Sequence, residues 1–263
     1  MTIKVAFLGL GKMGRAAAKS VFAASDMKVV AGFDIGSVGQ DIGVLAGCPP
    51  IGVKVDEPMT LEDVLSRTKP DVVVDFSSPA ACLANAKAVT AAGANMVIGT
   101  TGFSDEDMAR LKKSLKGAVI SPNMSVGVNV FFKLVGEAAK DLRGYDVEVV
   151  ESHHKFKKDA PSGTAMKAVK AITEAVGADM KRDVIYGRHG ECPRKGGQIC
   201  IHSIRAGDIV GEHTVMFTSE GERFELRHVA HSRDSFASGI PAAIRFVDGK
   251  EDIYDMADVL GLK

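Results

Sequence analysis

The sequence lacks a surplus of charge of either sign. Its 263 residues include 33 Lys and Arg against 33 Asp and Glu, and the sequence pI is about 7.1. Disordered chains combine a high net charge with low hydrophobicity, and nucleic-acid-binding proteins usually have a basic surplus, so both classes are disfavoured. With 46% hydrophobic residues, the chain can bury a real core without a disulfide or a metal to stabilise it.

Cysteines and long apolar runs are also scarce. The four cysteines, Cys48, Cys82, Cys192 and Cys200, form no C-x-x-C pair, which favours a reduced compartment over a disulfide framework. No apolar run approaches the roughly 18 residues that a membrane-spanning helix needs. The sequence has no low-complexity tract, heptad series or repeat of fixed period. We therefore predict a soluble, cytoplasmic protein that binds neither membranes nor nucleic acid.

In the first half of the chain, short apolar runs alternate with stretches of helical periodicity. Strands are predicted at residues 3–8, 28–34, 71–75, 95–98 and 118–120, and helices at residues 13–24, 61–67, 80–92 and 105–115. Strict alternation predicts parallel strands joined by right-handed crossovers, with helices on both faces of the sheet. The predicted fold class is therefore α/β, with a doubly wound, Rossmann-type parallel sheet.

The pattern changes after Ser125. Helices are predicted at residues 126–142 and 163–176, and strands at residues 145–151, 199–205, 210–218 and 223–230. This second α+β domain, over residues 125–232, is predicted to contain an open, mixed and largely antiparallel sheet. A helix at residues 235–247 returns the chain to the first domain, which then comprises residues 1–124 and 233–263.

A glycine-rich loop follows the first predicted strand. Gly9, Gly11 and Gly14 form a G-x-G-x-x-G pattern that allows a tight turn, approach of a pyrophosphate and close packing of the next helix. Asp34 ends the second strand about 20 residues later, where a carboxylate can accept the hydroxyls of a ribose. We predict a dinucleotide site, with a nicotinamide cofactor as the favoured ligand. The alternative is a plain glycine turn in which Asp34 caps a loop.

Two further segments follow predicted strands at the same edge of the sheet, where doubly wound folds bind ligands. They are residues 99–102 (Gly99, Thr100, Thr101 and Gly102) and residues 121–124 (Ser121, Pro122, Asn123 and Met124). Small side chains allow backbone groups to reach a cofactor there. Position alone leaves open that both segments are ordinary turns.

Residues 151–164, with the sequence ESHHKFKKDAPSGT, concentrate ionisable side chains in one strand-to-helix connection. Imidazoles transfer protons near neutral pH, ammonium groups hold carboxylates, and N–H groups at a helix N-terminus bind a further carboxylate. The candidates for this chemistry are His153, His154, Lys157, Gly163 and Thr164. Adjacent histidines leave a strand on opposite sides, so we expect His153 and His154 to have different tasks.

Two other interpretations of this segment stay open. A charged loop is most often simply solvated, with Ser162 as the cap of the following helix. Histidines 153 and 154, with more distant histidines, could hold a metal, but the sequence has no H-E-x-x-H motif and no cysteine pair. We predict that no metal is bound.

The block E-x-H-H-x-x-K-x-D-A-P-S-G-T-A at residues 151–165 resembles the signature of the dihydrodipicolinate reductase family. The resemblance extends over nearly the whole chain, through the glycine loop and residues 97–103, 123–129 and 205–213. It implies reduction of 4-hydroxy-tetrahydrodipicolinate to tetrahydrodipicolinate with NAD(P)H, in lysine and diaminopimelate biosynthesis. It also implies a homotetramer assembled through the second domain, which would then bind the substrate and support oligomerisation.

The resemblance assigns roles to individual residues. His153 would be the proton-transferring acid and base, and Lys157 the second catalytic residue, while His154, Gly163 and Thr164 would bind the dicarboxylate substrate. The residues that would contact the cofactor are Gly9, Leu10, Gly11, Lys12, Met13, Asp34, Gly99, Thr100, Thr101, Ser121, Pro122, Asn123 and Met124. The glycine loop is one residue shorter than the G-x-x-G-x-x-G form common in the family.

The surroundings of Asp34 bear on the choice between NADH and NADPH. The family acid is often followed by Arg, whereas Ile35 follows here, so a 2′-phosphate would meet a carboxylate without its usual cation. Lys12 or Arg15 could bend toward that phosphate from the glycine loop. We predict a preference for NADH, with NADPH as a second cofactor.

Two rival functions share the predicted first domain. One is another two-domain NAD(P)-dependent dehydrogenase, acting on a substrate such as aspartate or homoserine. The other is a sensor that binds the dinucleotide and catalyses no reaction. The His-His-x-x-Lys loop favours the reductase, because neither rival requires it.

Overall fold

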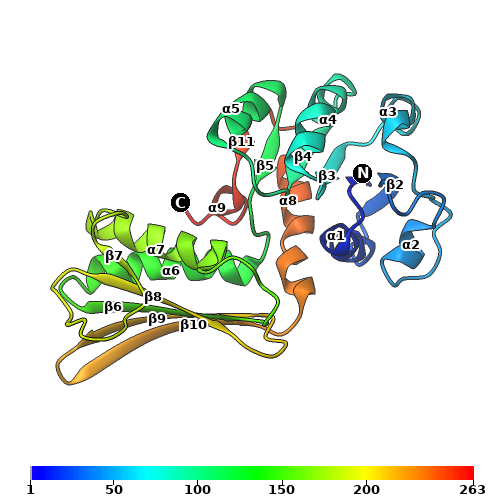
Figure 1. Ribbon diagram of the computed structural model, residues 1–263. Helices are drawn as coiled ribbons and strands as arrows, with labels where there is room; N and C mark the ends of the chain where they lie inside the picture. The colour runs from blue at the N-terminus through cyan, green and yellow to red at the C-terminus, as the bar shows by residue number, and fades with distance from the viewer. Residues whose placement is uncertain (1) are drawn as a thin grey trace. The chain divides into compact units, whose positions relative to one another are not determined.

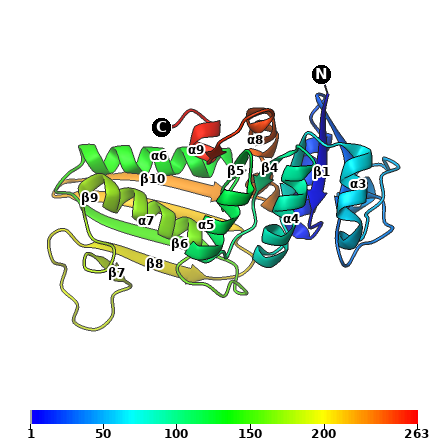
Figure 2. The same ribbon diagram turned by 90° about the horizontal axis from the view of Figure 1, so that it is seen from above.

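A computed structural model describes residues 2–263 (Figures 1 and 2). The chain divides into two compact units. The first unit comprises the N-terminal part up to Val126 and the segment Phe236–Lys263, and the second unit comprises Gly127–Ser235. The sequence predicts that the chain passes from the first domain to the second after Met124 and returns to the first after Ser232.

The first unit contains a six-stranded parallel sheet in the order β11-β5-β4-β3-β1-β2. Its strands are β1 (Ile3–Leu8), β2 (Met27–Phe33), β3 (Val72–Asp75), β4 (Asn95–Ile98), β5 (Ala118–Ile120) and β11 (Ile253–Tyr254). The order runs outward in both directions from β1 and β3. This confirms the predicted doubly wound sheet, to which the C-terminal segment adds β11 at one edge.

Helices pack on both faces of this sheet. One face is covered by α1 (Lys12–Phe22), α2 (Ile42–Leu45), α8 (Ile240–Val247) and α9 (Met256–Val259), and the other by α3 (Leu61–Thr68), α4 (Pro79–Ala91) and α5 (Asp105–Ser114). Along β1, Val5 and Phe7 enter the first core and Ala6 and Leu8 the second. Burial on both faces explains why the strands are continuous apolar runs. Within residues 2–263, no helix is both long and apolar enough to cross a membrane.

The helix predicted at residues 235–247 is interrupted. A 3₁₀ turn, η2 (Arg233–Ala237), precedes α8, and Gly239 lies between them. The N–H of Gly239 donates to the carbonyl of Met124 at 2.9 Å, and a Cβ at this position would lie 2.3 Å from that oxygen. The break therefore follows from a backbone contact that is distant in sequence and invisible to helical periodicity.

The second unit contains a five-stranded mixed sheet in the order β10-β9-β6-β8-β7. Its strands are β6 (Asp146–His153), β7 (Val184–Tyr186), β8 (Ile199–Arg205), β9 (Gly211–Ser219) and β10 (Glu222–Ala230). β9 is antiparallel to both β6 and β10, whereas β8 is parallel to β6 and β7. The predicted open, mixed and largely antiparallel sheet is confirmed, with β7 as an additional edge strand.

Two helices, α6 (Val126–Asp141) and α7 (Gly163–Val176), lie on the same face of this second sheet (Figures 1 and 2). Val147 and Val149 of β6 point into the core beneath them. Because side chains alternate along a strand, Glu151 and His153 lie on that same buried face. The end of β6 thus carries two ionisable side chains into the space at the N-terminal end of α7.

Candidate active site

The glycine loop of the first unit is built by close backbone packing. Gly9 has a positive φ of 81°, and its N–H donates to the carbonyl of Phe33 at 2.9 Å. A Cβ at Gly14 would lie 1.9 Å from the carbonyl oxygen of Gly9, so only glycine allows α1 to begin here. A Cβ at Gly11 would meet nothing within 4 Å. The loop is therefore open at Gly11, which precedes the first turn of α1 and its N–H groups.

Asp34 is joined to this loop by hydrogen bonds. Its Oδ2 accepts from the N–H of Leu10 at 2.7 Å, and its Oδ1 accepts from the N–H of Gly36 at 2.7 Å. The carboxylate, Gly11 and the exposed Ile35 line a cavity of about 320 Å³ at the carboxyl ends of β1, β2 and β3. An apolar wall beside a carboxylate suits a nucleoside, whose base is flat and apolar and whose ribose donates hydrogen bonds.

A cation lies close to the segment after Asp34. The Nε of Arg15 donates to the carbonyl of Leu10 at 2.7 Å, and its Nη2 donates to Ser37 Oγ at 3.2 Å. Lys12 is exposed at the start of α1. Of the two cations considered from the sequence, the structure therefore places Arg15 beside the turn that follows β2.

The other predicted cofactor residues divide into buried and exposed positions. Thr100 is buried, and its hydroxyl donates to Oδ1 of the buried Asp75 at 2.6 Å. Burial raises the pKa of Asp75. Leu10 and Met124 are core residues, which leaves only their backbone groups for a ligand. Buried positions also include Gly99 and Ser121, Met13 and Asn123 are half-buried, and Thr101 and Pro122 are exposed.

In the second unit, the side chain of Glu151 is fully buried and joins several groups. Its Oε2 lies 2.6 Å from Nδ1 of His153, and its Oε1 accepts from the N–H of Ser162 at 3.1 Å. Arg205 donates to both oxygens, Nη1 to Oε2 at 2.9 Å and Nη2 to Oε1 at 2.8 Å. Burial alone raises the pKa of Glu151, but the hydrogen bonds from His153 and Arg205 outweigh it and hold that pKa well below its usual value.

A second imidazole packs against His153. The rings of His153 and His213 meet edge to face, with centroids 5.3 Å apart, and Nε2 of His213 lies 3.2 Å from Ser162 Oγ. Burial, reinforced by the nearby His153, lowers the pKa of His213 to about 3. His213 is therefore a neutral side chain at physiological pH.

The remaining candidates of the second unit lie in the loop after β6 and at the start of α7. Lys157 forms an ion pair with Asp159 at 2.8 Å. Nδ1 of His154 is buried and has no hydrogen-bond partner within residues 2–263. Gly163 is exposed and Thr164 half-buried in the first turn of α7, which Ser162 caps by accepting from the N–H of Ala165 at 3.2 Å.

These contacts connect most of the predicted second-unit site. Arg205 donates to the carbonyl of Asp159 at 2.6 Å, so it links the Lys157–Asp159 pair to Glu151 and hence to His153. From the sequence, no role is assigned to Glu151, Arg205 or His213. Glu151 belongs to the block at residues 151–165, and Arg205 and His213 are the two ends of the block at residues 205–213. Arg205 is paired in register with His153, and His213 with Glu151. That register joins residues far apart in the chain.

No group of three or more His, Cys, Asp or Glu side chains suited to a metal is found within residues 2–263. The imidazoles of His153 and His213 instead contact a carboxylate, a serine hydroxyl and each other. The polar groups of this site therefore suit proton transfer and anion binding.

Comparison with known protein families matches both parts of the chain. Residues 3–124 match the family described as dihydrodipicolinate reductase, N-terminus, and residues 127–260 match dihydrodipicolinate reductase, C-terminus. The match spans nearly all of the chain and confirms the resemblance seen in residues 151–165.

Full-length relatives carry the same description. The 4-hydroxy-tetrahydrodipicolinate reductase of Methanosarcina mazei is 46% identical over 266 residues, which cover 99% of this chain and 100% of that protein. The enzyme of the same name from Methanocaldococcus jannaschii is 47% identical over 270 residues, covering 99% and 98%. A solved structure, dipicolinate-bound dihydrodipicolinate reductase from Paenisporosarcina sp. TG-14, has a TM-score of 0.77 and 30% identity, covering 97% and 98% of the two chains.

The lowered pKa of His213 makes the stability of the fold depend on pH. Between about 3 and the ordinary value of 6.5, the unfolded chain binds a proton that the folded chain does not. The free energy of unfolding therefore falls as the pH drops through this window, by up to about 1.4 kcal/mol per pH unit. His213→Gln should flatten the dependence, measured by urea unfolding between about pH 4 and pH 6. The exposed His189→Gln is the control, and equal slopes for wild type and His213→Gln would contradict the prediction.

Proposed function

The chain belongs to the dihydrodipicolinate reductase family, and on this basis we propose that it reduces 4-hydroxy-tetrahydrodipicolinate to tetrahydrodipicolinate in lysine and diaminopimelate biosynthesis. It is an NAD(P)H-dependent oxidoreductase. The observation that carries the assignment is the pairing of His153 with the buried Glu151, inside the residue block typical of the family. A cytoplasmic location stays a prediction of the sequence.

We assign cofactor binding to the first unit. The open loop at Gly11 and the N-terminus of α1 suit a pyrophosphate, and Asp34 with its cavity suits the adenosine ribose. Backbone and side-chain groups of residues 99–101 and 121–124 follow β4 and β5, at the same edge of the sheet. A nicotinamide cofactor held by these residues would supply hydride to the substrate.

We assign proton transfer to His153. An ionised carboxylate only accepts hydrogen bonds, so Nδ1 of His153 donates to Glu151 and Nε2 is the nitrogen that exchanges a proton with the substrate. The overall conversion removes the hydroxyl group of the substrate as water and adds two hydrogens. Hydride adds to a carbon of the unsaturated ring and the electron pair moves toward the ring nitrogen, which then needs a proton. An imidazole is suited to supply it near neutral pH.

We assign substrate binding to the loop after β6 and the start of α7. Lys157 holds Asp159 at 2.8 Å, and a substrate carboxylate would compete with Asp159 for this ammonium group. The first turn of α7, at Gly163 and Thr164, suits the second carboxylate, and His154 lies in the same loop. Binding of both carboxylates would fix the orientation of the substrate ring, from which much of the rate should originate.

Removal of the proton donor tests the assignment directly. His153→Gln should lower kcat about 10²-fold or more and change KM little, because general acid catalysis contributes about 10² to 10⁴. Steady-state kinetics with 4-hydroxy-tetrahydrodipicolinate measures both constants, and the exposed His189→Gln serves as the control. A His153→Gln enzyme with wild-type kcat would exclude His153 as the donor.

We propose that NADH is the preferred cofactor and that NADPH is also used. Asp34 favours a ribose with both hydroxyls free, whereas the guanidinium of Arg15 beside Ser37 would offset part of the repulsion of a 2′-phosphate. The balance of these two charges decides the size of the preference.

A paired substitution should shift that balance. Asp34→Ser combined with Ile35→Arg removes the carboxylate and adds a cation, so kcat/KM should rise for NADPH relative to NADH. The value of kcat/KM with NADPH is divided by the value with NADH for the same protein, so any loss of folded enzyme cancels. A wild-type enzyme that already favours NADPH would show that Arg15 or Lys12 outweighs Asp34.

We propose that the second unit also assembles a homotetramer through the face of its sheet that α6 and α7 leave uncovered. On this face the outward side chains of β6 and β9, such as Val150, Thr214 and Met216, are only half-buried. This face is mixed, since Val150 and Met216 lie on it together with the charged Glu148, and an open sheet with one uncovered face can be completed by another copy.

Sedimentation equilibrium of the full chain tests this assembly. We expect a tetramer for the wild type and dissociation for Val150→Glu, which places a charge on the uncovered face. Val44→Glu, at an exposed position of the first unit, should sediment like the wild type. A monomeric wild type would contradict the proposal.

A further inference from the structure

We propose that Glu151, held by Arg205, is a positioning residue that determines which ring nitrogen of His153 exchanges the proton. The proposal rests on the role assigned to His153 above and adds residues that act through it. Neither Glu151 nor Arg205 is proposed to touch the substrate.

The Glu151 carboxylate has four contacts with donor groups of three residues. Oε2 contacts His153 Nδ1 and Arg205 Nη1, and Oε1 contacts Arg205 Nη2 and the N–H of Ser162, with all four distances between 2.6 and 3.1 Å. Four contacts in fixed directions prevent rotation of the carboxylate. Because the carboxylate can only accept, the neutral ring of His153 must carry its proton on Nδ1. Nε2 is then the acceptor and donor toward the substrate.

Arg205 keeps this carboxylate ionised inside the protein. Its guanidinium is itself anchored, since it donates to the carbonyls of Ile204 at 2.7 Å and Asp159 at 2.6 Å. Without a cation, a fully buried Glu151 would tend to take up a proton, and a neutral acid could donate to Nδ1 instead of accepting from it. The arginine therefore protects the choice of tautomer at His153.

Stability alone gives little reason for such a pair. Burying two charges costs a desolvation penalty, and replacing a buried ion pair with well-packed apolar residues is often neutral or stabilising. The Glu151–Arg205 pair also lies at the N-terminal end of α7, because the carboxylate that contacts His153 accepts a hydrogen bond from the N–H of Ser162, the N-cap of α7. Glu151 thus connects the proposed proton donor to the proposed carboxylate-binding helix end.

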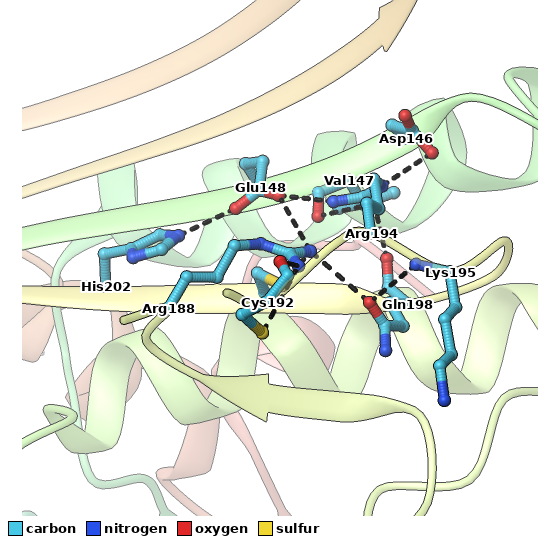
Figure 3. A network of polar contacts seen from close by, with 10 residues as sticks. Asp146, Val147, Glu148, Arg188, Cys192, Arg194, Lys195, Gln198 and His202 are labelled. Atoms are coloured by element: carbon cyan, nitrogen blue, oxygen red, sulfur yellow. Dashed lines mark hydrogen bonds and ion pairs between the residues drawn. The ribbon is translucent and has the colours of Figure 1, made fainter. Parts of the chain in front are cut away.

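The same strand offers a matched control. Glu148 lies three residues earlier on the opposite face of β6, and it too contacts an arginine and a histidine, Arg194 and His202 Nε2, the latter at 2.8 Å (Figure 3). Arg188 lies 3.6 Å from the same carboxylate. This outer network has the same chemistry as the Glu151 group but contacts none of the candidate site residues.

The experiment compares Glu151→Gln, Glu148→Gln and His153→Gln in the full chain. Glutamine keeps the shape of the side chain but replaces one acceptor oxygen with an NH₂ donor, which opposes the donors of His153 or Arg205. We expect Glu151→Gln to lower kcat roughly 10- to 100-fold, the range known for groups that orient metal-bound histidines, with a smaller change in KM. NADH affinity should stay at the wild-type level in both glutamate variants. Glu148→Gln, on the face of the sheet proposed for assembly, should leave the tautomer of His153 unchanged, and the exposed His189→Gln should keep its kcat.

Nitrogen NMR of the imidazoles gives a readout that a merely structural role would not change. The signal of His153 is assigned as the one that is lost in His153→Gln. In the wild type, at a pH where the ring is neutral, this signal should be that of an Nδ1–H tautomer. Glu151→Gln should convert it to Nε2–H or to a mixture. If Glu151→Gln does not fold, Arg205→Lys is the second variant, because it keeps the positive charge with fewer donors. It should lower kcat less than His153→Gln does, and His153 should keep its Nδ1–H tautomer.

The outcomes separate this proposal from the proposed function. A wild-type kcat in His153→Gln would contradict the role of His153 itself. An impaired His153→Gln together with a Glu151→Gln enzyme of wild-type kcat and unchanged tautomer would overturn only the positioning role. An Nε2–H tautomer in the wild-type protein would overturn it without any variant of Glu151.

Discussion

A carboxylate buried without access to water must be matched by donors on every side, and in the second unit Glu151 imposes this constraint. The three residues that contact it are His153 on β6, Arg205 at the end of β8 and Ser162 at the start of α7. The position of the proposed proton donor, the conformation of the loop after β6 and the start of α7 are therefore coupled. Moving any one of them would leave a buried charge without a partner, which is costly.

The first unit depends on a different constraint, the close approach of backbone at the carboxyl edge of its parallel sheet. Gly14 begins α1 against the carbonyl of Gly9, and Asp34 accepts from the N–H of Leu10. These contacts leave N–H groups and a carboxylate at one edge, which suits the phosphates and the ribose of a dinucleotide. The chemistry of the reductase family is thus divided between one unit suited to the cofactor and another suited to proton transfer and anion binding.

Much of this organisation follows from local sequence. The strands of the first sheet are predictable because burial on both faces makes them short apolar runs, whereas β7 and β11 have only three and two residues and leave little pattern. The candidate residues within the glycine loop and residues 151–164 are predictable because each set is contiguous. Arg205 and His213 are not, because strand register brings them to His153 and Glu151 and no periodicity encodes that register. The break at Gly239 has the same origin, a contact with the distant Met124.

In the proposed function, this chain couples oxidation of a nicotinamide cofactor to reduction of a cyclic dicarboxylate. The most direct measurement is the oxidation of NADH and of NADPH by the purified full chain when 4-hydroxy-tetrahydrodipicolinate is supplied. We expect oxidation of the cofactor that requires this substrate and is inhibited by pyridine-2,6-dicarboxylate. Turnover of aspartate or homoserine with the oxidised cofactor instead, or binding of the dinucleotide without turnover of any of these compounds, would contradict it.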